Sequence, residues 1–468
     1  MPVHTNKNEN NKFFNFPEEI LYKIFDFLGM SRLSFISRKT NEMTRYRYIR
    51  TKLNTNVDDL KKILEYSSYM HYLLIDCNND CDLKRLSNSV VGINFSNLES
   101  LILEKDKFFL ITKYFLHLIE KGQLINLVKL ALNISNPKFH LQELRGLKNI
   151  SKLKKLEILN LKIRRKTINS DIFMKCLMEG AGGSEIKILS FDFVASRFQP
   201  NTLKHLETLC ALKNLSTLSI DLTGAKISQQ ELNNIEELKG CKELRNLSIL
   251  LWGTEQGNDV VKALVNIGAK MDPINAKKMR SLNFDIGGNF ITKEEFQRFE
   301  GLSVFEHLIS FTFGAQGTQI EKGFSFVKNL KYLKNLTYYF GYCRLDLGID
   351  FLTELQETNI RNLNLDLRGN NLNNEHADKL AKLCASMTLL QHSSIYLTGN
   401  SIEEQGASSL LYKFNKHKSL LAYDQKVKNS NPDLKSVTVI IDLRQNPLEK
   451  QKRKNLLKAA CSYIDLRI

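Results

Sequence analysis

The stretch Ile360-Arg-Asn-Leu363-Asn-Leu365-Asp-Leu367-Arg-Gly-Asn-Asn-Leu372 decides the fold. Leucines at 363, 365 and 367 alternate with polar residues, which predicts a half-buried β-strand. Gly369 and two asparagines then break the strand, and segment 374–384 carries apolar residues at helical spacing. One strand and one helix of this size cannot bury their apolar faces alone. The stretch therefore predicts similar units on both sides of it.

Twelve further segments repeat this strand pattern. The residues equivalent to Leu363, which we call anchors, are spaced by 28, 29, 29, 30, 29, 29, 35, 29, 25, 27, 30 and 46 residues along the chain. The thirteen anchors are Leu73, Leu101, Leu130, Leu159, Leu189, Leu218, Leu247, Leu282, Phe311, Leu336, Leu363, Ser393 and Val439. The period resembles the ribonuclease-inhibitor-like class of leucine-rich repeats. That resemblance implies an α/β solenoid, a horseshoe with a curved parallel sheet of about 13 strands and outer helices.

The longest spacings and the C-terminal end depart from the regular unit. The 35-residue spacing includes segment 268–273, which predicts a surface loop. The 46-residue spacing includes the basic, turn-rich segment 413–435, which is either a contact loop or a solvated loop. We predict that the solenoid occupies residues 54–450 and that residues 451–468 form a C-terminal capping helix.

The N-terminal part of the chain has its own pattern. Residues 1–12 are polar, which predicts disorder and excludes a signal peptide. Residues 13–53 predict a small helical head, in which an apolar face follows Pro17. The head resembles an F-box, the module that docks substrate receptors onto the adaptor of a cullin-type ubiquitin ligase. The matching residues, and so the implied adaptor-binding set, are Phe16, Pro17, Ile20, Leu21, Ile24, Phe25 and Leu28, followed by Leu33 and Ile36-Ser37-Arg38.

The head also departs from the F-box pattern. The segment between Leu28 and Ile36 is about one helical turn short, and Thr40-Asn41 stands where the family has a tryptophan. The alternative interpretation is a helical cap over the apolar edge of the first repeat, which any solenoid needs.

Side chains alternate across each predicted strand, so the residues between its leucines face the open inner side of the sheet. The column three residues after each anchor is acidic at Asp76, Glu104, Asp192, Asp221, Asp285, Asp366 and Asp442. The chain as a whole has a net charge of +17, from 67 Lys and Arg against 50 Asp and Glu. We therefore expect an acidic concave floor, with the positive charge on the convex face, flanks and loops. Such a floor repels nucleic acid and favours a basic protein partner, unless the aspartates only bond their neighbours.

Aromatic residues on the same face are further candidates for partner binding. Trp252, the only tryptophan, lies five residues after its anchor beside the predicted neighbours Thr223 and Gly287. It is either a binding hot spot or an aromatic residue packed under loop 254–258. Tyr339 and Tyr396 are weaker candidates. A basic cluster at 148–166 is either a nuclear or anionic contact signal or a solvated helix flank.

Motifs for catalysis, metal binding or cofactor binding are lacking. Cys77 and Cys81 have no second pair at metal-ligand spacing, and eight cysteines are too few for a disulfide framework. No phosphate-binding loop or nucleophile elbow occurs, and no apolar run is long enough for a membrane helix. These patterns predict a non-enzymatic protein without cofactor, in a reducing cytosolic or nuclear compartment.

Three hypotheses for the function follow. The chain is a substrate-recognition subunit of a cullin-type ubiquitin ligase, as the F-box resemblance implies. Alternatively, it is a non-catalytic scaffold in a ciliary or cytoskeletal assembly, or a bacterial effector that imitates an F-box protein in the host cytosol.

Overall fold

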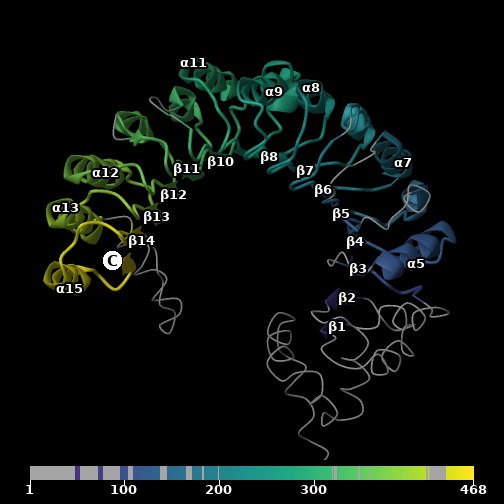
Figure 1. Ribbon diagram of the computed structural model, residues 1–468, viewed down its shortest axis with the longest axis horizontal. Helices are drawn as coiled ribbons and strands as arrows, with labels where there is room; N and C mark the ends of the chain where they lie inside the picture. Colours follow the sequence, from purple (N-terminus) through teal and green to yellow (C-terminus); the bar gives the residue numbers. More distant parts are fainter. Residues whose placement is uncertain are drawn as a thin grey trace, which may run out of the picture.

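The computed structural model describes residues 48–52, 72–76, 95–103, 109–136, 145–164, 171–181, 184–198, 200–318, 320, 324–345, 348–356, 358–417, 420 and 439–468. Within these ranges the strands form one 15-stranded parallel sheet in sequence order. The sheet lines the inner side of an arc, and the helices lie on its outer side (Figure 1). The predicted solenoid architecture is confirmed.

Each strand is short and parallel to the next. The strands are β1 (Tyr48–Lys52), β2 (Tyr72–Asp76), β3 (Ser100–Leu103), β4 (Lys129–Asn133), β5 (Ile158–Lys162), β6 (Ile188–Asp192), β7 (Thr217–Asp221), β8 (Asn246–Leu250), β9 (Ser281–Asp285), β10 (Ser310–Gly314), β11 (Asn335–Tyr339), β12 (Asn362–Asp366), β13 (His392–Tyr396), β14 (Val439–Asp442) and β15 (Ile464–Arg467). All thirteen anchors lie side by side in the pairing register, from Leu73 beside Leu101 to Ser393 beside Val439. The period in the sequence therefore fixes the register.

The sheet continues one strand beyond the predicted thirteen at each end. Strand β1 lies inside the range 13–53 predicted as a helical head, and it pairs with β2. At the other end, a helix covers only the first part of the predicted cap 451–468, and β15 follows it. Ile464 and Leu466 alternate with polar residues, so this segment extends the sheet. The predicted adaptor-binding residues 16–28 and the segment 421–435 lie outside the described residues.

The outer layer mixes α-helices with 3-10 helices. The α-helices are α5 (Phe109–Glu120), α7 (Asp171–Ala181), α8 (Gln229–Ile235), α9 (Asn258–Ala269), α10 (Pro273–Ala276), α11 (Lys293–Gln297), α12 (Asn374–Ser386), α13 (Glu404–Asn415) and α15 (Lys450–Ala459). The 3-10 helices are η5 (Arg145–Lys152), η6 (Lys204–Ala211), η7 (Glu236–Gly240), η8 (Arg298–Val304), η9 (Ser325–Asn329) and η11 (Asp350–Leu355). Among the described residues, the two shortest units, of 25 and 27 residues, return through η9 and η11, and two units of 29 residues return through η5 and η6, so the length of a unit does not decide its helix type.

The loop predicted at 268–273 is shorter in the structure, where residues 270–272 connect two helices. Helix α9 continues to Ala269, and α10 begins at Pro273. The Asp272 carboxylate caps α10 by accepting the backbone N–H of Ile274 at 2.9 Å. Asp272 before the helix and Pro273 in its first turn are both favourable at a helix start, and the same two residue types are also common in turns.

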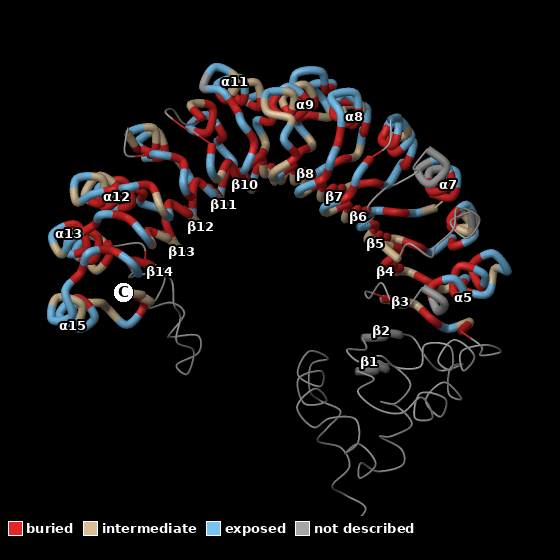
Figure 2. The backbone as a smooth tube through the Cα atoms, in the orientation of Figure 1, coloured by how far each residue is buried: buried red, intermediate tan, exposed pale blue. Residues whose placement is uncertain are grey.

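The core lies between the sheet and the outer layer, where anchor residues and helix residues pack together (Figure 2). A polar ladder crosses this core seven residues after the anchors. The buried Asn400 amide donates to the carbonyls of Leu367 and Leu397 at 3.0 and 2.9 Å. Its oxygen accepts the N–H groups of Asn370 and Leu372 at 2.9 and 3.0 Å. Asn289, Asn370 and Asn446 occupy the equivalent position, so the turns of successive units are joined by buried amides.

Candidate partner-binding face

The concave face is built by the alternation of each strand. In β12, Leu363 and Leu365 point into the core, while Asn364 lies on the open side between them. The column next to the anchors is small and polar from Asn160 to Ser394 and apolar at Ile102 and Ile440, and neighbouring polar members bond each other. The Asn283 amide, for example, donates to the Ser248 hydroxyl at 2.9 Å. The middle of the face is therefore free of large side chains in this column.

The acidic column has a structural cause that the sequence analysis gave only as an alternative. Five carboxylates of the column, those whose side chains the structure describes, accept the backbone N–H of the residue two positions later, at 2.9 to 3.3 Å, which turns the chain away from the sheet. This bond occurs at Asp192, Asp221, Asp285, Asp366 and Asp442. Asn133 makes the same bond to Ser135, so the turn requires an oxygen acceptor rather than a charge.

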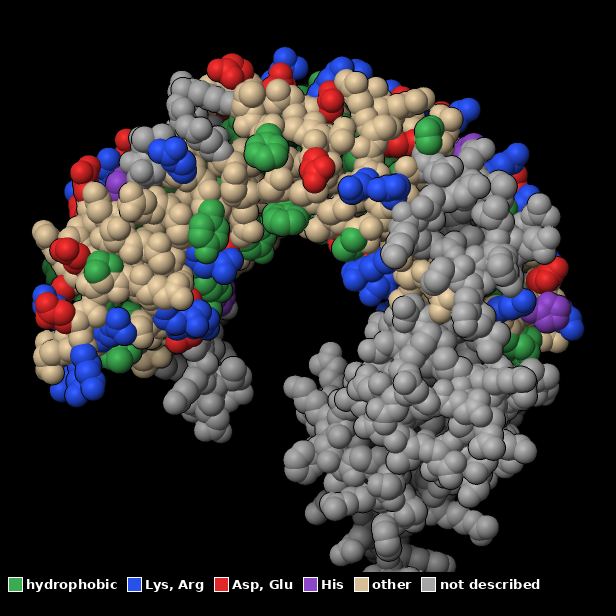
Figure 3. Space-filling model, viewed as in Figure 1, with side chains coloured by type: hydrophobic (Ala, Val, Ile, Leu, Met, Phe, Trp, Pro, Cys, Tyr) green, Lys and Arg blue, Asp and Glu red, His purple; other side chains and the backbone are tan. Residues whose placement is uncertain are grey.

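Arginines pair with three of these five aspartates on the concave face itself. Arg164 forms a bidentate pair with Asp192 from the neighbouring strand, with Nε and Nη2 both 2.8 Å from carboxylate oxygens. Arg368 and Arg444, in the turns after β12 and β14, pair with the aspartate two residues earlier, at the end of the strand. The expected acidic floor is therefore neutralised by arginine at these three positions, and positive charge lies on the concave face as well. Figure 3 shows Lys and Arg side chains along the inner rim on both sides of a central stretch.

The carboxylates differ in their electrostatic surroundings. Burial favours the neutral form of Asp442, but the bonds from Arg444 outweigh this effect, so the pKa of Asp442 lies below its ordinary value. Burial raises the pKa of Asp285, against a weaker opposing effect of the Gly287 N–H. Within the described residues, neither Asp221 nor Asp285 forms an ion pair, so the unneutralised acid lies in the middle of the arc.

Trp252 lies beside this acidic centre. Its indole is 43% exposed. A Cβ added to Gly287 would lie 2.5 Å from the Trp252 Cδ1 atom, and one added to Gly288 would lie 3.2 Å from Cε2. The ring thus rests on the bare backbone of the next unit. Partner binding at Trp252 stays a prediction, with packing under loop 254–258 as its alternative.

Other aromatic side chains are exposed nearby in the units that follow. Tyr339, in the same column as the aspartates, is 37% exposed, and Tyr396 is half-buried. Sequence reasoning missed Tyr342, which is 67% exposed and adopts a left-handed φ of 58°. Six neighbouring units have glycine at this turn position, because L-residues are strained there. An exposed tyrosine at a glycine position is the signal that identifies it.

Lysines of the basic cluster at 148–166, around η5 and β5, contact neighbouring units. Lys148 pairs with Glu179 at 2.8 Å, and Lys155 donates to the Asn126 side chain at 2.7 Å. These contacts favour the interpretation of this segment as a helix flank.

Features of other protein classes are lacking in the described part of the chain. No group of three or more His, Cys, Asp or Glu side chains there could hold a metal ion. None of the helices in the ranges given above has the length and apolar character needed to cross a membrane.

The continuous parallel sheet, the regular anchors and the asparagine ladder define a leucine-rich-repeat solenoid. Two solved structures with this repeat are similar. One is an internalin from Listeria monocytogenes, with 12% identity, 88% of this chain and 92% of that chain covered, and a TM-score of 0.42. The other is a leucine-rich-repeat protein from Leptospira interrogans, with 12% identity, coverage of 90% and 100%, and a TM-score of 0.33. No protein-family model and no curated protein matches the sequence.

Proposed function

We propose that the solenoid is a protein-binding module that captures a polypeptide partner on its concave face, with Trp252 at the centre of the contact. The observation that carries this proposal is the exposed indole held on Gly287 and Gly288. An aromatic ring that is fixed before binding loses little conformational entropy when a partner covers it. Tryptophan is also the residue type most enriched at energetic hot spots.

The surroundings of Trp252 favour a polypeptide over nucleic acid. Asp221 and Asp285 carry negative charge that no described cation neutralises by direct pairing, and phosphates would be repelled there. A polypeptide can supply backbone N–H groups, lysine or arginine to these carboxylates. Tyr339 and Tyr342 extend the apolar contact along the face. The concave set proposed for partner binding is therefore Asp192, Asp221, Trp252, Asp285, Tyr339, Asp366, Tyr396 and Asp442, together with Tyr342.

The test is selection of binders from a displayed library of random peptides on the full chain, followed by affinity measurement on variants. Trp252→Ala should weaken the selected binders about 30-fold, which corresponds to about 2 kcal/mol. The matched control is Tyr412→Ala, which removes an exposed aromatic side chain from outer helix α13. Equal affinities for wild type, Trp252→Ala and Tyr412→Ala would sink the proposal.

We further propose that this module serves as a substrate receptor of a cullin-type ubiquitin ligase in the cytoplasm. The support is the F-box-like sequence pattern at Phe16-Pro17, Ile20-Leu21, Ile24-Phe25 and Leu28, directly before the repeats. A pull-down with the ligase adaptor should recover wild type but not the Ile20→Asp/Ile24→Asp double variant. Equal recovery of the two proteins, or none of either, would leave a scaffold with a plain cap as the better hypothesis.

A further inference from the structure

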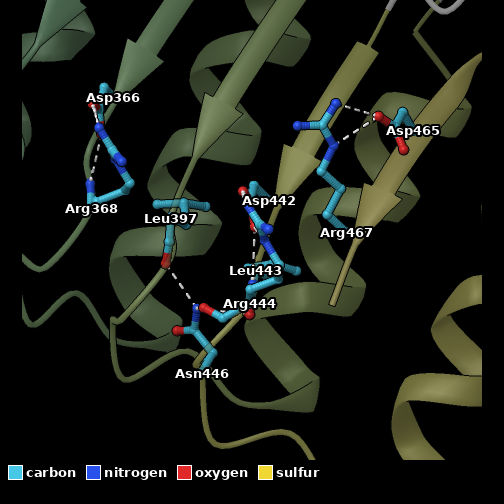
Figure 4. Close-up of polar contacts among 9 residues, drawn as sticks. All are labelled: Asp366, Arg368, Leu397, Asp442, Leu443, Arg444, Asn446, Asp465 and Arg467. Atoms are coloured by element: carbon cyan, nitrogen blue, oxygen red, sulfur yellow. Dashed lines mark hydrogen bonds and ion pairs between the residues drawn. The ribbon is translucent and has the colours of Figure 1, made fainter.

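The sequence Asp-Leu-Arg occurs at three strand ends in the C-terminal third of the sheet (Figure 4). The three copies are Asp366-Leu-Arg368 on β12, Asp442-Leu-Arg444 on β14 and Asp465-Leu-Arg467 on β15. In each copy the guanidinium folds back along its own strand onto the aspartate. Arg368 and Arg444 each lie five residues after their anchors, whereas Arg467 stands in register with Asp442, two positions earlier in its unit. We call Arg368 and Arg444, with Arg467 at their edge, the arginine row.

The first two pairs share one bidentate geometry. Arg368 donates through Nε and Nη2 to the two Asp366 oxygens at 2.8 and 2.6 Å. Arg444 makes the same bonds to Asp442 at 3.0 and 2.7 Å. In the third copy, Nε and Nη2 of the arginine lie 2.9 and 2.7 Å from one oxygen of Asp465. The inner edge of each guanidinium is thus occupied and its orientation fixed.

The aspartates end their strands without needing these arginines. Asp221 and Asp285 make the same bond to the backbone N–H two residues later, although Thr223 and Gly287 stand at the arginine position. The turn is therefore complete without a guanidinium. The guanidinium groups of Arg368 and Arg444 are therefore not needed to form these turns.

What they add is a row of outward-facing donors. The side chains of Asp366 and Asp442 are 4% and 1% exposed, whereas those of Arg368 and Arg444 are 47% and 59% exposed. Because Nε and Nη2 serve the inner edge, Nη1 and the second Nη2 hydrogen point to the outer edge. Across the described residues, no acceptor bonds Nη1 in any member of the row.

The spacing of the row suits an extended ligand. Strand β13 separates β12 from β14, so the backbones that carry Arg368 and Arg444 are about 10 Å apart. Tyr396 of β13 lies between the two strands, in register with Asp366 and Asp442. Side chains two to four residues apart in an extended peptide span a distance of this order.

We propose that the arginine row binds the carboxylates of an acidic polypeptide segment that crosses the C-terminal third of the concave face. This proposal rests on the proposed function, because it gives the chemistry of one part of the partner. Each guanidinium donates two hydrogen bonds from its outer edge to a carboxylate of the ligand, and the buried aspartate fixes the orientation of the guanidinium before the ligand binds. The sequence alone had favoured a basic partner on this face. The arginine row instead requires acidic residues in the segment that reaches β12–β15.

The experiment uses the full chain and peptides selected from the random library described above. Arg368→Thr/Arg444→Thr is the test variant, because it copies the Asp221–Thr223 arrangement that β7 already tolerates. Arg164→Thr is the matched control, since it removes an equivalent exposed Arg–Asp pair from the other flank. A second test leaves the protein unchanged and replaces each peptide glutamate or aspartate by glutamine or asparagine. Affinities are measured by fluorescence anisotropy, with thermal unfolding as the control for folding.

The selected peptides should be enriched in Asp and Glu, and the double arginine variant should bind them at least tenfold more weakly. The amide-substituted peptides should lose the same factor on wild type and nothing further on the double variant. Arg164→Thr should change affinity less than twofold. Two results would overturn the acidic-segment proposal and leave the proposed function standing. In the first, peptides that depend on Trp252 bind equally well before and after their Asp and Glu are replaced by Asn and Gln. In the second, such peptides bind only when they are phosphorylated. Peptides indifferent to Trp252→Ala would overturn the proposed function itself.

Discussion

Replacing Gly287 by alanine puts a methyl group where the indole of Trp252 lies. The new Cβ would be 2.5 Å from Trp252 Cδ1 and 3.0 Å from the Gln316 backbone nitrogen, whereas ordinary contact begins at 3.4 Å. The ring must therefore move by at least 0.9 Å (3.4 − 2.5) or change rotamer. Leaving a favoured rotamer costs about 1 kcal/mol, and the backbone contact adds to it, so we expect a loss of about 1–2 kcal/mol in unfolding free energy.

The assay is intrinsic fluorescence, because Trp252 is the only tryptophan. Gly287→Ala should shift the emission to longer wavelength and make the indole easier to quench with acrylamide, and it should weaken the selected peptides about tenfold or more. The control is Gly317→Ala, at a left-handed φ of 72° with open space around the new Cβ. This control costs about 1–2 kcal/mol through backbone strain but should leave the emission unchanged. An unchanged emission spectrum in Gly287→Ala would refute the placement of the indole on Gly287.

Three further substitutions test the account. Asp285→Asn should raise thermal stability at neutral pH, because burial raises the pKa of this carboxyl in the folded protein and so disfavours its charged form. The gain in stability should shrink as the pH falls to where Asp285 is protonated, and a gain that grows on acidification would contradict this reasoning. Asn400→Ala should lower the unfolding free energy by about 3 kcal/mol or more, since four buried backbone groups lose their partner, and a change below about 1 kcal/mol in chemical denaturation would be inconsistent with the ladder. Tyr342→Gly should weaken peptide binding but change stability by less than about 1 kcal/mol, because relief of left-handed strain offsets the lost ring contact with Gly369; a large destabilisation would show that the tyrosine serves the fold.

The repeat architecture could be predicted because its cause is periodic in the sequence. Each anchor occupies the same place in its unit, and parallel strands without crossovers bring these places together. The strand β15 was missed because the residues before it have helical spacing, which extended the predicted cap past Ser462. The helices of the short units were missed because apolar spacing does not distinguish a 3-10 helix from an α-helix.

The candidate site could be predicted only in part. The position of Trp252 on the open face followed from strand alternation, but the surface against which its ring packs is formed by Gly287 and Gly288 of the next unit. The pairing of Asp366 with Arg368 was overlooked, although residues two apart in a strand share a face and lie within reach of a long side chain. The charge of the aspartate column alone does not give the charge of the face, because arginines two residues further along the chain pair with some of these aspartates.

The most direct test of the central claim is whether a bound partner covers Trp252. In a complex saturated with a peptide selected on the full chain, acrylamide should quench the emission much less than in the free protein. The protection should titrate with the same dissociation constant as the anisotropy signal. An indole that stays equally accessible to acrylamide in the saturated complex would show that the partner binds elsewhere on the solenoid, contrary to the proposed function.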